Sequence, residues 1–344
     1  MSETTTTAVY AVTDRGARLG TRLADALDAV LYLPERLDPA LPGKRYAALG
    51  PLVAETFDRY RAHIFLSACG IAVRVIAPHL RGKAVDPAVV VVDDTGRFAI
   101  SLLSGHLGGA NALARTVGGL IGAVPVVTTA TDAAGAPAVE LLARDLGLAL
   151  DNAVATRRVN AALASGEPVA VYDPLGFFSL ADPGQAKCFE WLAAPEPPGP
   201  DQPLVVVDWR LGPETPETLY LRPSVLVVGV GCRRGAPAGA ILELVHAVCA
   251  QAKASPKSLG LLASIEAKRD EPGLLEAAAT LGVATRFFTA AELANVPVPH
   301  PSAVVGKHMG VESVCEAAAK AASAGGRLLV PKTKSALATA ALAV

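Results

Sequence analysis

The stretch that most constrains the fold runs from Phe98 to Asn111 and reads FAISLLSGHLGGAN. An apolar, strand-like run breaks into a glycine turn that carries His106, and the chain then enters a helix. Glycine lets the backbone approach a ligand closely, and the start of a helix offers unpaired N–H groups to negative charge. The stretch therefore predicts a strand, a turn that holds an anion and a helix, although a tight connection alone also accounts for such a turn.

Two further apolar runs end in small, polar or charged residues. Leu66 to Val92 reads LSACGIAVRVIAPHLRGKAVDPAVVVV, and Val124 to Asp132 reads VPVVTTATD. In a parallel sheet the loops that follow the strands converge along one edge, where open α/β folds bind ligands. We therefore expect one cleft to collect all three segments.

Composition supports a globular α/β protein. The 344 residues are 51% hydrophobic and 18% charged, which is ample for the cores of two domains or three small ones. Valine and alanine dominate, as expected when valine-rich strands alternate with alanine-rich helices. The net charge of −1 offers no basic surplus for nucleic acid and no acidic tail.

The N-terminus and the cysteines indicate a cytoplasmic protein. MSETTTTAVY lacks a basic segment followed by an apolar core, and no apolar run approaches the ~20 residues needed to cross a bilayer. The five cysteines are scattered and odd in number, without a C-x-x-C pair. We therefore expect reduced thiols, no disulfide framework and no structural zinc site.

Periodicity divides the chain into three regions. Residues 1–136 alternate strands and helices, with a hairpin at Asp93 to Gly96 and a helix over 110–121. Residues 137–222 form a smaller middle region with a weaker pattern and a proline-rich connection at 195–200. Residues 223–344 begin a second α/β unit, which opens with a strand, a Gly-Cys-Arg-Arg-Gly turn and a helix.

Several motifs resemble one known family. The segments ACGIAVR, KAVDPAVVVVD, LLSGHLGGAN and PVVTTATD occur in the order found in cobalt-precorrin-5A hydrolases of anaerobic cobalamin synthesis. VGVGCRRG, SIEAKRDEPGL, GVESVCEAA and LLVPK resemble the C-terminal domain of that family. The first fifty residues and roughly 150–222 carry little that is diagnostic.

The resemblance implies a reaction and its partners. The family opens a lactone between the ring A acetate of cobalt-precorrin-5A and the carbon to be expelled; the two-carbon unit leaves as acetaldehyde, and cobalt-precorrin-5B results. No cofactor and no protein-bound metal are implied, because cobalt arrives inside the substrate. The expected partner is the precorrin macrocycle, without nucleic acid or membrane; transient contact with other enzymes of the pathway and a homodimer are both compatible with the sequence.

Three residues are candidates for catalysis. His106 is the first choice for the base that activates water, since imidazole both accepts and returns a proton near neutral pH; hydrogen bonding to a substrate carboxylate is the alternative role. Asp132 either orients His106 or activates water, but an aspartate after a strand is also a common helix cap. Glu271 lies in a mixed-charge group for which a surface ion pair is an equal explanation.

A substrate with several acetate and propionate groups requires separated cationic or N–H donors. Arginine presents a fork of donors that matches a carboxylate, so Arg233 and Arg234 beside a helix start are candidates, with solvated surface charges as the alternative. The expected substrate-binding residues are Arg74, Lys83, Ser104, Gly105, Gly108, Gly109, Asn111, Thr128, Thr129, Gly231, Arg233, Arg234, Lys268 and Lys332. We expect the Ser104 to Asn111 and Gly229 to Gly235 turns on opposite walls of one cleft between the N-terminal and C-terminal units.

Two other functions fit parts of the sequence. The C-terminal unit also resembles small proteins of the aerobic cobalamin pathway, which suggests a non-catalytic precorrin carrier; a carrier would not need LLSGHLGGAN and TTATD. A nucleotide-dependent oxidoreductase is disfavoured, because the third glycine of Gly229 to Gly235 comes one residue too late for G-x-G-x-x-G.

Overall fold

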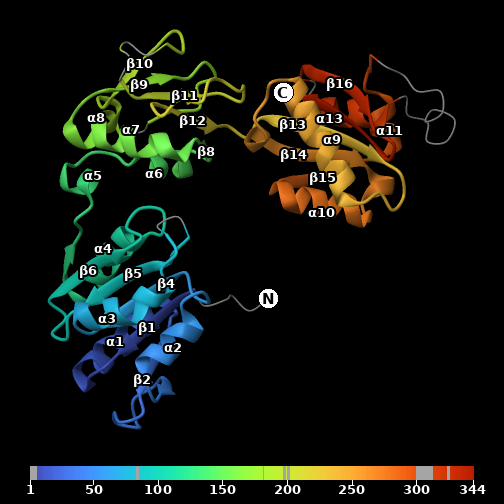
Figure 1. Ribbon diagram of the computed structural model, residues 1–344. Coiled ribbons are helices and arrows are strands. Elements are labelled where there is room, and N and C mark those ends of the chain that lie inside the picture. The colour runs from blue at the N-terminus through green and yellow to red at the C-terminus, as the bar shows by residue number, and fades with distance from the viewer. Residues whose placement is uncertain are drawn as a thin grey trace. The chain divides into compact units, whose positions relative to one another are not determined.

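The computed structural model describes residues 6–82, 85–180, 182–196, 199, 202–299, 313–323 and 326–344. The chain forms two compact units, Met1–Leu141 with Leu163–Gly166, and Leu142–Ala162 with Glu167–Val344. Each unit combines sheets rich in parallel pairs with covering helices (Figure 1). The expected α/β class is confirmed.

The N-terminal unit is built on a seven-stranded sheet in the order β3-β2-β1-β4-β5-β6-β7. Its strands are β1 (Thr7–Ala11), β2 (Val30–Pro34), β3 (Lys44–Tyr46), β4 (Ala62–Leu66), β5 (Ala88–Val92), β6 (Phe98–Leu103) and β7 (Val124–Val126). All neighbouring strands of this sheet pair in parallel except β5 and β6. The central strands β1, β4 and β5 are almost wholly buried, as apolar runs in a parallel sheet should be.

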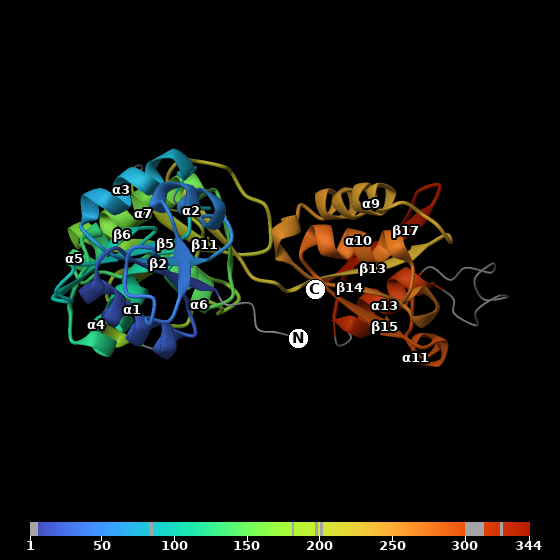
Figure 2. The ribbon, with the colours of Figure 1, turned by 90° about the horizontal axis from the view of Figure 1, so that it is seen from below.

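Helices cover both faces of this sheet (Figure 2). One face is covered by α1 (Asp14–Leu27) and α4 (Ala110–Ile121), and the other by α2 (Leu49–Thr56) and α3 (Cys69–Ile76). A 3-10 turn, Ala77–His79, follows α3, and the short helix α5 (Ala130–Ala133) follows β7. α4 lies at the predicted range because its apolar positions recur at helical spacing and pack on the buried valines of β5.

The hairpin predicted at Asp93 to Gly96 is confirmed, and it reverses the direction of the chain. Gly96 has φ +70°, which glycine adopts at no steric cost, and its N–H donates to the carbonyl of Asp93 at 2.8 Å. Val92 pairs with Leu66 at the carboxyl end of β4, whereas Val89 pairs with Leu103 at the carboxyl end of β6. The loops after β4 and after β6 therefore leave the sheet at opposite ends of its strands.

This reversal corrects part of the expectation of one cleft for three segments. The segments that follow β6 and β7 do meet, because these two strands are parallel neighbours. The segment that follows β4 starts at the other end of the strands, and within it the exposed Arg74 donates to the carbonyl of Gly70 at 3.0 Å. The hairpin between β5 and β6 thus keeps the residues directly after β4 away from the other two segments, whereas the later part of the same segment reaches the turn after β6 at Asp86.

His63 is fully buried in the core of this unit, and its surroundings favour the neutral form of the imidazole ring. His63 Nδ1 lies 3.1 Å from the hydroxyl of Tyr10, and Nε2 lies 3.1 Å from the carbonyl of Phe57. A neutral ring satisfies both contacts when Nε2 donates and Nδ1 accepts. Burial lowers the pKa of His63 to about 4, against the raising effect of the hydrogen bond to Phe57.

We expect this histidine to make the N-terminal unit sensitive to acid. In the unfolded chain the imidazole takes up a proton near pH 6.5, but in the folded chain it does so only near pH 4. The free energy of unfolding is therefore highest above pH 6.5 and falls by about 3 kcal/mol as the pH is lowered to 4. His63→Asn should remove this part of the pH dependence, whereas exposed His246→Asn should retain it. Denaturant unfolding followed by tyrosine near-ultraviolet circular dichroism measures both; an unchanged slope in His63→Asn contradicts the assignment.

The second unit contains two five-stranded sheets. The first has the order β10-β9-β11-β12-β8 and the second β15-β14-β13-β17-β16. The first is formed by β8 (Ala149–Asp151), β9 (Val169–Tyr172), β10 (Phe189–Trp191), β11 (Leu204–Val207) and β12 (Thr218–Arg222), with α6 (Val139–Asp145), α7 (Ala153–Ser165) and α8 (Pro183–Ala186) in the same stretch of chain. The second is formed by β13 (Leu226–Cys232), β14 (Leu259–Ile265), β15 (Ala284–Phe288), β16 (Leu328–Lys334) and β17 (Ala338–Ala343).

The C-terminal sheet is also covered on both faces (Figure 2). One face carries α9 (Ala238–Gln251) and α10 (Pro272–Leu281), and the other carries α11 (Ala290–Ala294) and α13 (Val314–Ala322). Short 3-10 turns lie at Pro256–Ser258 and Glu266–Lys268. Helix α13 begins at Val314, and residues 300–312 lie outside the described residues.

A buried ion pair connects the middle sheet to the C-terminal one. Arg222 is 2% exposed; its Nε lies 3.1 Å from Asp151, whose other carboxylate oxygen accepts from Lys257 at 3.0 Å. Trp209 packs in the core formed by β13 and α9, and its carbonyl accepts from Ser255. These contacts explain why most of the middle region forms one compact unit with the C-terminal sheet; the boundaries expected at 136 and 222 stay predictions.

Candidate active site

The turn after β6 is closed by its own atoms. Ser104 has φ +56°, a region that few non-glycine residues adopt, and its hydroxyl donates to the carbonyl of Asp86 at 2.9 Å. A Cβ on Gly108 would lie 2.3 Å from that of Ser104, and one on Gly105 would lie 2.6 Å from the side-chain oxygen of Asn111. Glycine is therefore required at 105 and 108 by packing inside the turn.

Three backbone amides at the end of this turn are paired within the turn. The N–H groups of Gly109, Ala110 and Asn111 donate to carbonyl groups of the turn itself at 2.9–3.1 Å. Gly109 has φ +88° and precedes α4 without a side-chain cap. These three amides therefore fix the shape of the turn, and the turn also presents the side chain of His106. Anion binding by the N–H groups of residues 105–108, which donate to no backbone carbonyl in the turn, stays a prediction.

The imidazole of His106 lies between two carboxylates. Its Nδ1 is 3.0 Å from Glu140 Oε1, and its Nε2 is 3.2 Å from Asp132 Oδ2. The hydroxyl of Thr131 also lies 3.1 Å from Nε2. The side chain of Glu140 is 5% exposed, whereas those of His106 and Asp132 are 16% and 21% exposed. One edge of the ring is therefore buried, and the other is accessible to solvent.

Asp132 is the centre of a hydrogen-bond network from three elements. Its Oδ2 accepts from the side-chain amide of Asn111 at 2.8 Å and from the hydroxyl of Thr129 at 2.7 Å. Its Oδ1 pairs with Arg115 of α4. Burial alone would raise the pKa of Asp132, but the hydrogen bonds from Thr129, Arg115 and His106 outweigh it and hold that pKa below its usual range. Asp132 is therefore a carboxylate at neutral pH.

The contacts are compatible with two protonation states of His106. In the neutral ring with Glu140 accepting, the Nδ1–H donates, and the lone pair of Nε2 accepts from the hydroxyl of Thr131. When Nε2 takes up a proton, Asp132 Oδ2 is the nearby acceptor. The ring can therefore accept a proton on its exposed side and have the resulting charge stabilised there, which general base catalysis requires.

Sequence reasoning missed Glu140, Thr131 and Arg115. Glu140 lies in the first turn of α6, and its distance of 34 residues from His106 in the sequence gave no pairing signal. The structure brings together four residues that the sequence did predict, namely His106, Asn111, Thr129 and Asp132. Thr128 is exposed beside them, and Lys83 lies outside the described residues.

The second turn, at the end of β13, presents its arginines to solvent. Arg233 and Arg234 are exposed, and the backbone N–H of Arg233 donates to the carbonyl of Leu337 at 2.9 Å. Gly235 has φ +73° and closes the turn. Two exposed guanidinium groups held on a fixed backbone are compatible with carboxylate binding, which stays a prediction.

Glu271 and Lys268 are partners of this second turn. Glu271 Oε1 accepts from the N–H of Gly235, and its Oε2 lies 3.0 Å from the ammonium group of Lys268. The hydrogen bond from Gly235 and that from Lys268 lower the pKa of Glu271. Both carboxylate oxygens of Glu271 thus contact neighbouring residues of the protein, which favours a structural role for this side chain. A catalytic role for Glu271 and substrate binding by Lys268 stay predictions.

Two other predicted residues lie near this turn in the C-terminal sheet. A Cβ on Gly231 would lie 2.9 Å from the hydroxyl of Thr339, so glycine fits the approach of β17. The backbone N–H of Lys332 donates to the buried Glu316 at 2.9 Å, and its side chain is half-buried. These contacts fix the backbones of both residues; substrate binding by Gly231 and Lys332 stays a prediction.

Gly229 is required by a helix that crosses β13. A Cβ at this position would lie 1.9 Å from the carbonyl oxygen of Cys315 in α13. Gly229→Ala should therefore force α13 off the sheet and destabilise the second unit by about 1–3 kcal/mol or more. The matched variant Gly239→Ala, at an exposed helical position with no atom within 4 Å of the new Cβ, should gain about 0.5 kcal/mol. Denaturant unfolding followed by tryptophan fluorescence measures both, and equal midpoints would show that the crossing tolerates a methyl group.

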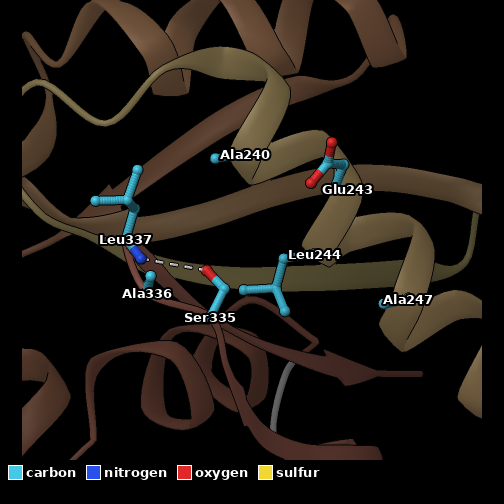
Figure 3. Close-up of a pocket in the computed structure, with 7 residues that line it drawn as sticks. All are labelled: Ala240, Glu243, Leu244, Ala247, Ser335, Ala336 and Leu337. Atoms are coloured by element: carbon cyan, nitrogen blue, oxygen red, sulfur yellow. Dashed lines mark hydrogen bonds between the residues drawn. The ribbon is translucent and has the colours of Figure 1, made fainter.

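A cavity of about 340 Å³ lies between α9 and the turn that joins β16 to β17 (Figure 3). Ala240, Leu244, Ala247 and Leu337 line it, and Glu243 carries the only charge among its lining residues. One carboxylate in an apolar groove would repel a polyanionic ligand. This cavity is therefore a poor site for a substrate that carries many carboxylates.

Across the described part of the chain, no three His, Cys, Asp or Glu side chains come together as a metal site. No helix in those described ranges is both long and apolar enough to cross a membrane. All five cysteines are free thiols.

Three family profiles match the chain in sequence order. They are Cobalamin synthesis G N-terminal over residues 51–132, Cobalamin biosynthesis central region over 137–223, and Cobalamin synthesis G C-terminus over 226–343. Together they cover most of the chain.

Curated proteins from three sources are similar to this chain. A cobalt-precorrin-5A hydrolase of Priestia megaterium is 35% identical over 302 residues, which are 85% of this chain and 81% of that protein. The cobalt-precorrin-5A hydrolase of Salmonella typhimurium is 34% identical over 334 residues, 92% of each chain. Protein CobE of a Sinorhizobium species is 39% identical over 123 residues, 34% of this chain and 79% of that protein. The chain belongs to the cobalamin synthesis G family, whose members include these cobalt-precorrin-5A hydrolases.

Proposed function

We propose that this protein hydrolyses the ring A lactone of cobalt-precorrin-5A in anaerobic cobalamin synthesis. Acetaldehyde then leaves and cobalt-precorrin-5B is the product. The similarity to two hydrolases over more than four fifths of each chain supports the substrate. The observation that carries the chemistry is the imidazole of His106 between Glu140 and Asp132, with its Nε2 on the more exposed side.

In the proposed reaction His106 Nε2 removes a proton from a water molecule that attacks the lactone carbonyl. The carbon–oxygen bond of the lactone breaks, the acetate is freed as a carboxylic acid, and the protonated ring returns its proton to the departing alkoxide. Glu140 holds the proton on Nδ1 so that Nε2 is the acceptor. Asp132 stabilises the ring while it carries both protons.

The oxyanion of the tetrahedral intermediate needs a donor. The hydroxyl of Thr129 is engaged with Asp132, which leaves the exposed Thr128 hydroxyl as the candidate of the pair. Arg115 is half exposed beside the same carboxylate and supplies positive charge at the edge of the site. The cobalt ion belongs to the substrate, and no cofactor is part of the proposal; the cytoplasm is the proposed compartment.

A non-catalytic precorrin carrier is the alternative function. The similarity to protein CobE favours it for about one third of the chain. A carrier has no need of a histidine fixed between two carboxylates, and this cluster lies in the N-terminal unit. The hydrolase therefore explains more of the chain.

The two functions differ in turnover. The purified chain is mixed with a molar excess of cobalt-precorrin-5A, and acetaldehyde and the mass of the macrocycle are followed together. We expect many acetaldehyde molecules per protein chain. A stoichiometric complex with unchanged substrate mass would support the carrier and refute the hydrolase.

We expect Arg233 and Arg234 to contribute to substrate binding. Replacing both with glutamine should weaken binding of a precorrin analogue more than it slows the chemical step of the bound substrate, because the arginines contact carboxylates before and after lactone opening alike. Equilibrium titration and single-turnover rates separate the two effects. Unchanged affinity would eliminate these arginines as anchors.

A further inference from the structure

A second cavity, of about 510 Å³, opens in the N-terminal unit beside the His106 turn. Leu107 and Gly108, the two residues that follow His106 in the chain, form part of its wall. Consecutive Cα atoms are 3.8 Å apart, so this wall is joined directly to the catalytic turn. The cavity lies at the edge of the sheet where Ser104 donates to the carbonyl of Asp86, which is itself a lining residue.

The charges of this cavity leave one cation without a partner. The carboxylate of Asp86 accepts from the backbone N–H groups of Arg81 and Gly82 at 2.9 and 3.1 Å, so it closes its own loop. Arg81 forms an ion pair with Asp58. The guanidinium of Arg61 is exposed and has no hydrogen-bond or ion-pair partner among the residues that the structure describes. Arg61 is therefore the hydrogen-bond donor in this cavity that is available to bind a ligand.

The remaining wall is apolar and partly exposed. The side chains of Leu107 and Val85 are 47% and 63% exposed, and Phe57, Tyr60 and Pro87 lie deeper in the lining. An apolar surface next to an arginine fits a flat hydrocarbon ring with a carboxylate at its rim. The volume suits one edge of such a macrocycle and its side chain.

We propose that this cavity binds one carboxylate-bearing corner of the precorrin ring. Arg61 takes the carboxylate in a bidentate pair, and Leu107 and Val85 contact the ring edge. This inference rests on the proposed function, because it assumes a polycarboxylate macrocycle as the ligand. Among the predicted residues that the structure describes, only Gly108 lines this binding site.

The test compares Arg61→Gln with Arg59→Gln, an exposed arginine that does not line the cavity. The probes are a cobalt corrinoid polycarboxylate and the same corrinoid with its carboxylates methylated. Loss of one charge-assisted pair should weaken binding of the acid about tenfold in Arg61→Gln and leave binding of the ester unchanged. With cobalt-precorrin-5A the KM should rise and kcat should stay constant.

Equal affinity of Arg61→Gln and Arg59→Gln for the acid would overturn the site, as would an equal loss for acid and ester. Failure of the proposed function gives a different result. In that case the unmodified protein does not release acetaldehyde from cobalt-precorrin-5A, whether or not acid binding depends on Arg61.

Discussion

Replacing His106 with alanine should lower the rate of lactone opening by roughly 10²–10⁴-fold, the usual contribution of a general acid–base group. The imidazole is the only group in the cluster that can accept a proton on the exposed side, because Asp132 already accepts from Asn111 and Thr129. Single-turnover rates with bound substrate measure the effect. A rate near that of the unmodified protein would show that another group activates water.

The control for this variant addresses folding. Alanine at 106 leaves the carboxylate of Glu140 without its imidazole partner in a buried position, which costs stability. His106→Asn retains a polar side chain and should lose activity to a similar extent. Both variants should give the circular dichroism of the parent protein, and exposed His246→Ala should retain full turnover.

The second large effect is expected at Glu140. Glu140→Gln keeps the size of the side chain but removes the charge that fixes the proton on His106 Nδ1. We therefore expect kcat to fall roughly 10²–10⁴-fold and KM to stay constant, as for the carboxylate partner of a catalytic histidine. Loss of this charge also disfavours the protonated ring, which should move the acidic limb of the pH–rate profile to lower pH. A merely structural role would not move that limb.

Matched variants sharpen this prediction. Glu140→Asp keeps the charge at a greater distance and should restore part of kcat. Glu55→Gln removes an exposed carboxylate of α2 in the same unit and should leave the kinetics unchanged. If Glu140→Gln lowers thermal stability but keeps the pH–rate profile of the parent protein, Glu140 is not a positioning residue.

Local patterns predicted most elements of the sheets. The valine run of β5 and the apolar run of β6 lie at the predicted residues, because buried strands read as continuous apolar stretches. The strands β2, β3, β8, β10 and β12 were missed, and so was β17. Its sequence, ATAALA, is rich in alanine and has helical propensity, and only its place between β13 and β16 makes it a strand.

The candidate site was predicted in part. His106, Asn111, Thr129 and Asp132 were identified because the turns that carry them follow apolar strands. Glu140 could not be identified, since its contact with His106 depends on how α6 packs. The amides of Gly109, Ala110 and Asn111 donate to carbonyl groups inside the turn, which could not be predicted from the sequence; anion binding by the remaining turn amides stays a prediction. The cleft expected between the Ser104 to Asn111 and Gly229 to Gly235 turns stays a prediction.

The most direct test of the proposed mechanism follows the oxygen atom of water into the product. Cobalt-precorrin-5A is converted by the unmodified protein and by His106→Ala in water labelled with heavy oxygen, and the macrocycle is analysed by mass spectrometry. With the unmodified protein, one labelled oxygen should be incorporated into the freed acetate of each product molecule. With His106→Ala, almost no label should be incorporated in the same time. A product that has lost acetaldehyde but carries no label in the macrocycle would contradict attack of water on the lactone carbonyl.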